Sequence, residues 1–368
     1  MNQCWCNKKM KIGIDISPVL YGTGVSRYTE NLVKNLLKLN SGDDYVLFGG
    51  SLRRRKGLVR FASTLSGIFV SKFFYYPPTL ADIVWNRMHK FKVEKLIGKI
   101  DVFHSSDWTQ PPTDAFKVTT IHDLIPLKFP KCIHPQIVSV HRRRLEWVKK
   151  EADRVVVPTE ATKKDSVIYG IAEEKIRVIS EAPGYSLSSR KDVDGVKRKY
   201  NIRTKYLLAV GLSPYKNTER IIKAFDLVGG GKDLKLVVVG RPNFVDIKER
   251  RGVMFVGSIP DTELSTLFTG AEALVFPSLY EGFGLPILDA FNCGIPVVTS
   301  NISSMPEVAG DAAVLVDPYD VNSIAEGIEK VLRGPKGFIE KGLARIKDFS
   351  WEKTAQETLK VYKESINK

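Results

Sequence analysis

The chain has 368 residues, of which 43% are hydrophobic, so it is long and apolar enough for two or more globular domains and is not a disordered protein. No apolar run reaches the roughly 18 residues that a membrane-spanning helix needs, and the first ten residues lack the apolar core of a signal peptide, which favours a cytoplasmic protein. The net charge of +15 is concentrated in residues 1–190, where 31 Lys and Arg stand against 18 Asp and Glu. We therefore expect this half to bind an acidic partner, either an anionic membrane surface or a charged glycan. Nucleic acid is a third candidate, but the sequence holds no recognised nucleic-acid-binding motif.

Apolar segments alternate with helical patterns from end to end, which is typical of α/β proteins with parallel sheets. In the first half we expect a strand at residues 11–16, a helix at 25–39 and a basic helix at 141–151. Further strands are expected at residues 45–48, 102–104, 118–121, 154–157 and 176–179. Residues 69–76 place several aromatic side chains near basic runs at 53–56 and 87–92. Of these, residues 73–76 form either a buried strand, which we favour, or part of a membrane-facing surface.

Two segments of this half have the position and chemistry of a binding site. Gly22 and Gly24, between the first strand and the first helix, allow close approach of the backbone, and the helix N-terminus behind them favours an anion. An ordinary tight turn has the same pattern. His122 follows a predicted strand, at the edge where α/β sheets bind ligands, although nearby backbone can equally satisfy a histidine there.

A polar stretch around Pro183 and Gly184 separates the two halves, and we expect one domain over residues 1–184 and another over 185–350. The second half repeats the alternation. Strands are expected at residues 206–210, 234–239, 253–256 and 273–276, a helix at 218–227 and a terminal helix from 349 to 362.

Two charged segments of the second half allow two interpretations each. Lys216, which follows Gly211 and precedes a helix, can either neutralise a diphosphate or be an ordinary solvated lysine. Asp192 and Asp194 have the spacing of some divalent-metal sites, but they stand at a predicted helix start, so we expect capping there and no bound metal.

The most informative stretch runs from residue 276 to 310. Glu281 precedes Gly282 and Gly284, which can adopt backbone angles closed to other residues, and Pro286 suits the first turn of a helix. The free N–H groups of that helix start can bind phosphate. Asp289 lies in the same first turn, where its carboxylate can accept hydrogen bonds from sugar hydroxyls.

At these residues the chain resembles the retaining glycosyltransferases of family 4, whose signature is two glutamates separated by seven residues. Here the pair is Glu281 and Asp289, and the flanks EGFGLPILDAF, GIPVVTSN and SSMPEVAGDAAVLVDP are similar to those of the family. The resemblance covers residues 11–362. It implies the GT-B fold, with two Rossmann-like domains whose parallel sheets face a central cleft. It also implies that the C-terminal helix crosses back, so that residues 351–368 join the first domain.

The resemblance also implies roles for individual residues. His122 and Glu281 would contact the transferred sugar, Lys216 the diphosphate and Asp289 the ribose. Further donor-binding residues would be Gly22, Gly24, Gly211, Arg241, Gly282, Phe283, Gly284 and Leu285. The family usually has an arginine near the lysine, whereas the corresponding positions of this chain hold Leu212 and Tyr215, and Arg241 is the candidate substitute.

The implied activity is the transfer of a hexose, with retention, from a nucleotide diphosphate sugar to a glycan or lipid-linked acceptor, without metal or cofactor. The segment around His122 and the SSMPEVAGDAA segment are most similar to mannosyltransferases, so GDP-mannose is the first expected donor and a UDP-sugar the second. A phosphorylase of similar fold and a basic nucleic-acid-binding protein are two rival interpretations. The protein is expected in the cytoplasm, with peripheral attachment to the inner face of the membrane.

Overall fold

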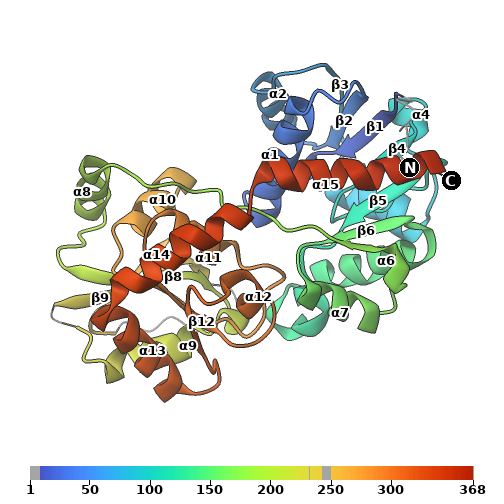
Figure 1. Ribbon diagram of the computed structural model, residues 1–368. Coiled ribbons are helices and arrows are strands. Elements are labelled where there is room, and N and C mark those ends of the chain that lie inside the picture. The colour runs from blue at the N-terminus through green and yellow to red at the C-terminus, as the bar shows by residue number, and fades with distance from the viewer. Residues whose placement is uncertain (1–8, 232, 243–249, 368) are drawn as a thin grey trace, which may run out of the picture.

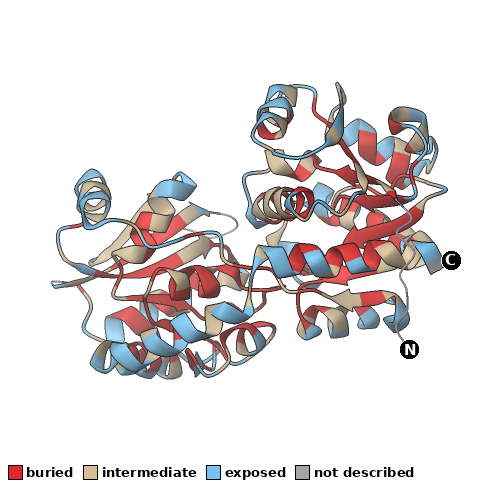
Figure 2. Ribbon diagram, turned by 45° about the horizontal axis from the view of Figure 1, so that its top comes forward, coloured by how far each residue is buried: buried red, intermediate tan, exposed pale blue. Residues whose placement is uncertain are grey.

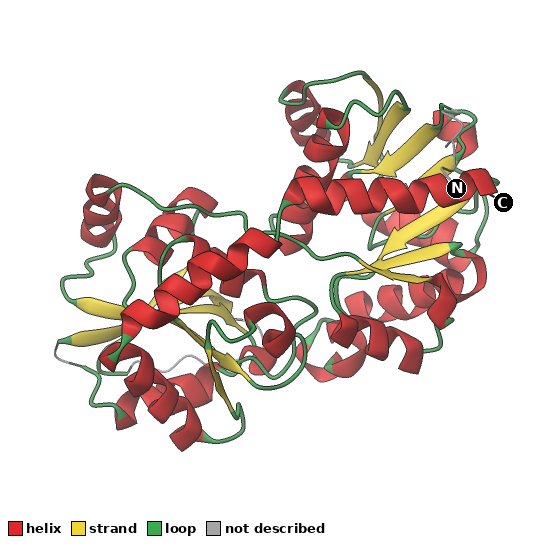
Figure 3. Ribbon diagram, in the orientation of Figure 1, coloured by secondary structure: helices red, strands yellow, loops and turns green. Residues whose placement is uncertain are grey.

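The computed structural model describes residues 9–231, 233–242 and 250–367. The first eight residues, to which the sequence assigns no function, lie outside the described residues. The chain forms two domains, each a parallel sheet packed between helices (Figures 1 and 3). The α/β fold class predicted from the sequence is therefore confirmed.

The N-terminal sheet has seven parallel strands in the order β3-β2-β1-β4-β5-β6-β7. The strands are β1 (Lys11–Asp15), β2 (Asp44–Gly50), β3 (Phe69–Phe74), β4 (Val102–Ser105), β5 (Phe116–Thr120), β6 (Arg154–Val157) and β7 (Ile176–Val178). The longer helices are α1 (Gly24–Lys38), α2 (Arg55–Ser63), α6 (Pro135–Glu151) and α7 (Glu160–Ile168). The short helices are η1 (Ser17–Leu20), α3 (Pro78–Ala81), η2 (Asp82–Arg87), α4 (Glu94–Ile97), α5 (Ile125–Lys128), η3 (Pro130–Cys132) and η4 (Glu173–Lys175).

The C-terminal sheet has six parallel strands in the order β10-β9-β8-β11-β12-β13. The strands are β8 (Lys205–Leu212), β9 (Leu234–Pro242), β10 (Val253–Gly257), β11 (Ala273–Phe276), β12 (Val297–Ser300) and β13 (Val314–Val316). The helices are α8 (Arg190–Lys199), α9 (Thr218–Leu227), α10 (Asp261–Thr269), α11 (Leu285–Asn292), α12 (Met305–Ala309), α13 (Val321–Arg333), α14 (Pro335–Arg345) and α15 (Trp351–Lys363). The 3-10 turns are η5 (Pro214–Lys216), η6 (Ile346–Asp348) and η7 (Glu364–Asn367).

Three sequence expectations need correction or extension. The aromatic segment does form a strand, β3, but the preference for a buried strand is wrong, because β3 lies at the sheet edge and pairs only with β2. Val70 is 53% exposed and Tyr75, just beyond the strand, is 69% exposed. Helix α6 begins at Pro135, six residues before the expected start. Strand β13 was not predicted.

Helix α15 leaves the C-terminal domain and crosses onto the N-terminal one (Figure 1). Its residues Ala355, Leu359 and Tyr362 are buried in the same apolar cluster as β1 and α1. Trp351 begins the helix and donates from Nε1 to the carbonyl of Pro183 at 3.0 Å. The crossover implied by the family resemblance is therefore present.

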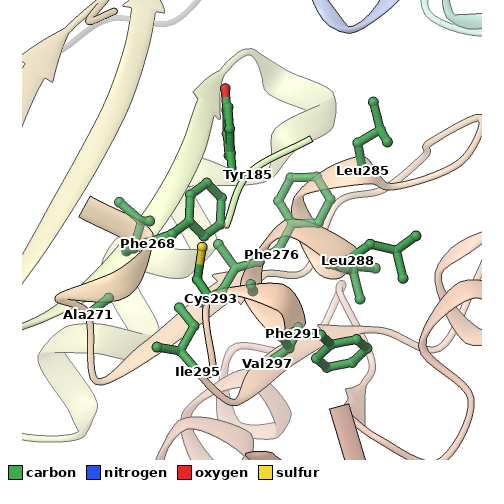
Figure 4. Close-up of a cluster of buried hydrophobic side chains, with 14 of the residues drawn as sticks. Tyr185, Phe268, Ala271, Phe276, Leu285, Leu288, Phe291, Cys293, Ile295 and Val297 are labelled. Carbon is green, nitrogen blue, oxygen red and sulfur yellow. The ribbon is translucent and has the colours of Figure 1, made fainter. Parts of the chain in front are cut away.

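The segment between β7 and α8 links the two cores. Ile179 belongs to the N-terminal cluster, whereas Tyr185 packs in the C-terminal cluster, with its ring centroid 5.8 Å from that of Phe268 (Figure 4). The strands of both sheets are largely buried beneath their helices (Figure 2). Within the described residues, no helix combines the length and the apolar character needed to cross a bilayer.

Candidate functional site

Lys216 and Glu281 form an ion pair between the β8–α9 and β11–α11 connections. Lys216 Nζ lies 2.6 Å from Glu281 Oε1, and the two side chains are only 19% and 10% exposed. Burial by itself lowers the pKa of Lys216, but the charges of Glu281, Tyr215 and Asp123 outweigh it and raise the pKa above the usual value. Lys216 is therefore a fixed and largely buried positive charge.

Gly211 makes the position of this lysine attainable. Its φ of +95° suits glycine, and a Cβ atom there would lie 2.9 Å from Cγ of Lys216. A larger residue would push the lysine stem away from Glu281. Gly211, which the family resemblance assigns to donor binding, thus lies directly against the Lys216 side chain.

Two serines of the β12–α12 connection fix the loop that carries Glu281. Ser303 Oγ donates to the Glu281 carbonyl at 2.8 Å, and Ser304 Oγ donates to the carbonyls of Glu281 and Phe283 at 3.0 and 2.9 Å. In the sequence these serines appear only as part of a family-like segment. Their role was missed because a hydrogen bond between connections about 20 residues apart has no local pattern.

The Glu281 loop docks directly on the N-terminal domain. A Cβ atom at Gly282 would lie 1.8 Å from the carbonyl oxygen of His122, so no side chain fits at this contact. Thr159, the N-cap of α7, and Thr162 each donate from Oγ1 to the Gly282 carbonyl at 2.8 Å. His122 and Glu281, which the sequence placed in one site, are therefore brought together across the domain boundary.

His122 lies beside a carboxylate that the sequence did not single out. Its Nδ1 is 3.1 Å from Oε1 of Glu181, which is only 4% exposed and follows β7. Burial lowers the pKa of His122, but the hydrogen bond and charge of Glu181, with Asp107 and Asp123, outweigh it, so the pKa lies above its usual value. The sequence indicates this role of Glu181 only weakly, because a single glutamate after a strand is equally common in an exposed turn.

Asp123 lies between His122 and the Lys216–Glu281 pair. Its Oδ1 accepts a hydrogen bond from the Ile125 amide at 2.8 Å. Burial raises the pKa of Asp123 to about 6, against the lowering effects of that amide, His122 and Lys216. Its protonation therefore changes near neutral pH.

Asp289 is buried and bonded to the protein itself. Its Oδ2 lies 2.7 Å from Nη1 of Arg27 on α1, and its Oδ1 accepts from the amides of Gly184 and Tyr185 at 2.8 and 3.1 Å. This pair joins α1 of the N-terminal domain to α11 of the C-terminal domain. Burial raises the pKa of Asp289, and Arg27 and the two amides oppose this rise. The expected contact of Asp289 with a ribose stays a prediction.

The other predicted donor-binding residues lie around α1 and α11. Gly24 begins α1 and faces Leu285, with a Cβ position 3.6 Å from Leu285 Cδ1, while the Gly22 amide is held by Ser26 Oγ at 2.8 Å. Gly284, at φ +105°, is the N-cap of α11.

Two further residues of that prediction differ in how far they are exposed. Phe283 is buried and packs edge-to-face on Phe349. Arg241 is exposed at the end of β9, which pairs with the end of β8 shortly before Lys216, and it makes no hydrogen bond or ion pair with another described residue. Asp192, in the first turn of α8, bonds with its N-cap Ser189, as expected for capping.

Aromatic rings and a cavity complete the region between the domains. Phe129 contacts Tyr215 and Tyr280 with ring centroids 6.0 Å apart in both pairs, and the Tyr215 ring centroid lies 5.7 Å from Lys216 Nζ. An open cavity of about 890 Å³ lies on the Arg27 side, between α1, the linker and α10. The sequence predicted neither.

Comparison with known families decides how this arrangement is classified. A family model described as "Glycosyl transferases group 1" matches residues 192–347, and one described as "Glycosyltransferase Family 4" matches residues 22–182. The chain belongs to glycosyltransferase family 4. One match lies in each domain, so both domains of the glycosyltransferase belong to the family.

Known relatives agree with this classification. The glycosyltransferase is 27% identical to O-antigen chain mannosyltransferase B of Escherichia coli, over 96% of its own chain and 100% of that protein. It is 32% identical to the O-antigen chain mannosyltransferase RfbU of Salmonella typhimurium, over 59% of its own chain and 61% of that one. The crystal structure of Anabaena Alr3699/HepE with UDP and glucose has the same fold, with a TM-score of 0.70 at 14% identity, covering 96% and 100% of the two chains.

Proposed function

We propose that this glycosyltransferase moves a hexose from a nucleotide diphosphate sugar to a glycan or lipid-linked acceptor, with retention of configuration and without a metal or cofactor. One observation carries the proposal: Lys216 and Glu281 form a largely buried ion pair at the start of α11, against His122 of the opposite domain. Such a place combines a fixed cation, a helix N-terminus and a sugar-binding carboxylate.

Lys216 would stabilise the leaving diphosphate. An ammonium group has three N–H donors, and Glu281 occupies one of them in the structure, so Lys216 can bind a phosphate oxygen without losing Glu281. Its buried charge acts where negative charge develops as the glycosidic bond breaks. The backbone of Gly282, Phe283, Gly284 and Leu285, at the positive end of α11, would add to this stabilisation.

Glu281 would hold hydroxyls of the transferred sugar. Its Oε1 is bonded to Lys216, and Oε2 has no hydrogen bond to another described residue, so it can accept from a hydroxyl. Ser303 and Ser304 keep the loop from moving when it does so. His122, held by Glu181, would contact the same sugar from the other domain.

Asp289 remains our proposed ribose ligand, but with a condition. Both of its oxygens are bonded to Arg27 and the linker amides, so a ribose hydroxyl must share or replace one of these bonds. We also retain Gly22, Gly24, Gly211 and Arg241 as donor-side residues. For Arg241 the proposal requires its exposed side chain to turn towards the diphosphate when the donor binds.

GDP-mannose is the first proposed donor, because two relatives of this chain are named mannosyltransferases. A UDP-sugar is the second. Calorimetry with GDP-mannose, UDP-glucose and the free nucleotides tests the choice: GDP-mannose should bind at least about tenfold more tightly than UDP-glucose. Equal or reversed affinities would exclude GDP-mannose as the preferred donor.

Retention and metal independence need separate measurements. The anomeric configuration of the initial product, read by NMR, should be that of the donor, and an inverted product would refute the proposal. Turnover should persist in EDTA, since Lys216 supplies the positive charge at the diphosphate. Loss of turnover in EDTA with recovery on adding manganese would assign that role to a metal.

We further propose that the acceptor-side domain comprises residues 1–184 with 351–368 and that the donor-side domain comprises residues 185–350. Ile179 packs in the N-terminal cluster and Tyr185 in the C-terminal cluster, which supports this division.

We also propose that the acceptor-side domain rests on an anionic membrane surface. Basic Arg53 lies beside Leu52, which is 55% exposed, and the edge strand nearby exposes Val70. Exposed apolar groups beside cations suit a charged lipid surface.

A further inference from the structure

We infer that Glu181 is a positioning residue that holds His122 as an oriented imidazolium, with both ring nitrogens protonated, at the contact between the two domains. The catalytic consequence rests on the proposed function, whereas the charge state of His122 does not. Neither the family resemblance nor the comparisons assign a role to Glu181.

The backbone around Glu181 is held by α15, and its side chain is held by His122. Glu181 lies in the segment that follows β7, and α15 holds that segment through two carbonyls: Thr354 Oγ1 donates to Ser180 O at 2.7 Å and Trp351 Nε1 to Pro183 O at 3.0 Å. The Glu181 side chain is only 5% exposed, and His122 is its one ion-pair partner within the described part of the chain. The negative charge of a buried carboxylate favours the protonated, positively charged form of a histidine bonded to it.

The imidazole ring is also fixed in direction. Its edge-to-face contact with Tyr28 has ring centroids 4.5 Å apart at 78°. The Tyr28 hydroxyl bonds with Thr120 Oγ1 at 3.1 Å, and Thr120 Oγ1 bonds with His104 Nε2 at 2.9 Å. His122 therefore cannot turn away from Glu181 without disturbing a hydrogen-bonded chain beneath it.

The charged and titratable groups that face His122 favour its cation. Asp107 from the β4 connection and Asp123 from its own loop add negative charge to that of Glu181, and together they overcome the cost of burial. Neighbouring His104 offers little repulsion, because burial, followed by the charges of His122 and Arg144, lowers its pKa to about 3 and keeps it neutral. Tyr28 stays protonated because burial raises its pKa.

The charge state decides what His122 can offer a ligand. With Nδ1–H donating to Glu181, an imidazolium presents a second donor at Nε2, whereas a neutral ring with the same bond would present an acceptor there. A cation at this place would also supply positive charge in a chain that has Leu212 and Tyr215 at the positions where the family usually has an arginine. Glu181 would then act on the reaction only through His122.

The first test is an NMR titration of the full chain labelled in histidine, without any donor. The His122 signal is identified by its loss in His122→Asn. We expect a pKa above 6.5 in the wild type and a fall of about one unit or more in Glu181→Gln. Glu326→Gln, at an exposed carboxylate on α13, is the matched control and should change nothing. A wild-type pKa below 6.5, or an unchanged pKa in Glu181→Gln, would overturn the inference.

The second test is the pH profile of GDP-mannose turnover. Glu181→Gln should move the alkaline limb of kcat/KM to lower pH, and Glu181→Asp, which keeps the charge, should restore part of the shift. If Glu181 has a purely structural role, Glu181→Gln should lower the Tm and leave the alkaline limb of kcat/KM where it is. That outcome would contradict a positioning role. If Glu181→Gln does not fold, the wild-type titration and Glu181→Asp still decide. If no nucleotide sugar is turned over but His122 titrates as expected, the proposed function fails and the Glu181–His122 pair stands.

Discussion

Lys216 has a structural role in its ion pair with Glu281 and, in the proposed function, a chemical role as well. Its Nζ is bonded to Glu281 and its stem passes over Gly211, so its charge is directed at one place before any donor binds. A charge that is already oriented costs no reorganisation when the diphosphate leaves.

We expect Lys216→Ala to lower kcat/KM about a hundredfold, because loss of one preorganised charge at a developing anion costs ~3 kcal/mol. Lys223→Ala, at an exposed lysine on α9, is the control and should retain full turnover. Steady-state kinetics with unchanged circular dichroism provides the measurement. A loss of less than threefold would remove Lys216 from the mechanism.

The two acidic residues of the family signature should respond differently. Glu281→Gln should depress turnover with little change in the affinity for free nucleotide, because Glu281 is assigned to the sugar. Asp289→Asn should weaken binding of the nucleotide diphosphate, if Asp289 reaches the ribose, by about 1.5–3 kcal/mol for a lost charged hydrogen bond. Calorimetry that gives the reverse pattern would show that the two roles are exchanged.

The Arg27–Asp289 pair adds a stability test at the same position. Asp289→Asn should lower the free energy of unfolding by about 2 kcal/mol, since a buried charged hydrogen bond is lost. Arg27→Ala should lower it too, and the double variant should cost less than the sum, because the two groups share one contact. Additive losses in urea unfolding would mean that the pair contributes no coupling.

At the scale of elements, α15 holds the N-terminal domain through a buried hydroxyl. The Tyr362 hydroxyl lies 2.6 Å from Nδ1 of His104 on β4. Tyr362→Phe should lower the free energy of unfolding by about 1–3 kcal/mol, because it leaves the His104 nitrogen buried without a partner. Tyr319→Phe, at a tyrosine that is 60% exposed, should be neutral. Equal stability of both variants would show that the contact contributes nothing.

His104 also gives the fold a defined pH dependence. Its folded pKa of about 3 lies below the unfolded value near 6.5, so between these values only the unfolded chain binds the proton. The free energy of unfolding should therefore fall as pH falls from 6.5 towards 3. Between pH 7 and 5 the wild type should lose about 2 kcal/mol more than His104→Gln, measured by urea unfolding. Parallel curves for the two proteins would refute the assignment.

At the scale of the whole molecule, the basic N-terminal half should bind anionic vesicles. Replacing Arg53, Arg54 and Arg55 with Ser should weaken sedimentation with such vesicles about tenfold or more and spare nucleotide affinity, and salt should screen the effect. The matched control replaces three exposed cations of the other half, Lys191, Arg198 and Arg203, and should leave vesicle binding unchanged.

Two outcomes would contradict membrane attachment through this face. Equal binding to neutral and anionic vesicles at low salt would remove the role of charge. Equal loss in both triple variants would show that net charge, and not the N-terminal face, governs the interaction. Arg55 also donates to the Phe73 carbonyl at 3.1 Å, so a Tm measurement must show that strand β3 is intact in the variant.

The local patterns of the chain determined the fold class and the positions of most elements. Alternating apolar strands and helical segments appear in the structure close to their predicted ranges, because hydrophobic periodicity is a local property that burial on a sheet reinforces. The glycines and acidic residues around Glu281 identified the family for the same reason, since the family signature is a local pattern of residues at fixed spacing. Burial of β3 was misjudged, because its place at the sheet edge depends on its neighbours.

Contacts between segments far apart in the sequence were decided only by the tertiary structure. Glu181 reaches His122 across 59 residues, and Arg27 reaches Asp289 across 262, so neither pair has a spacing that a sequence pattern could reveal. The sequence supplies each buried charge, but the fold chooses its partner, because the cost of burying that charge is offset only by whichever opposite group the packed chain places beside it.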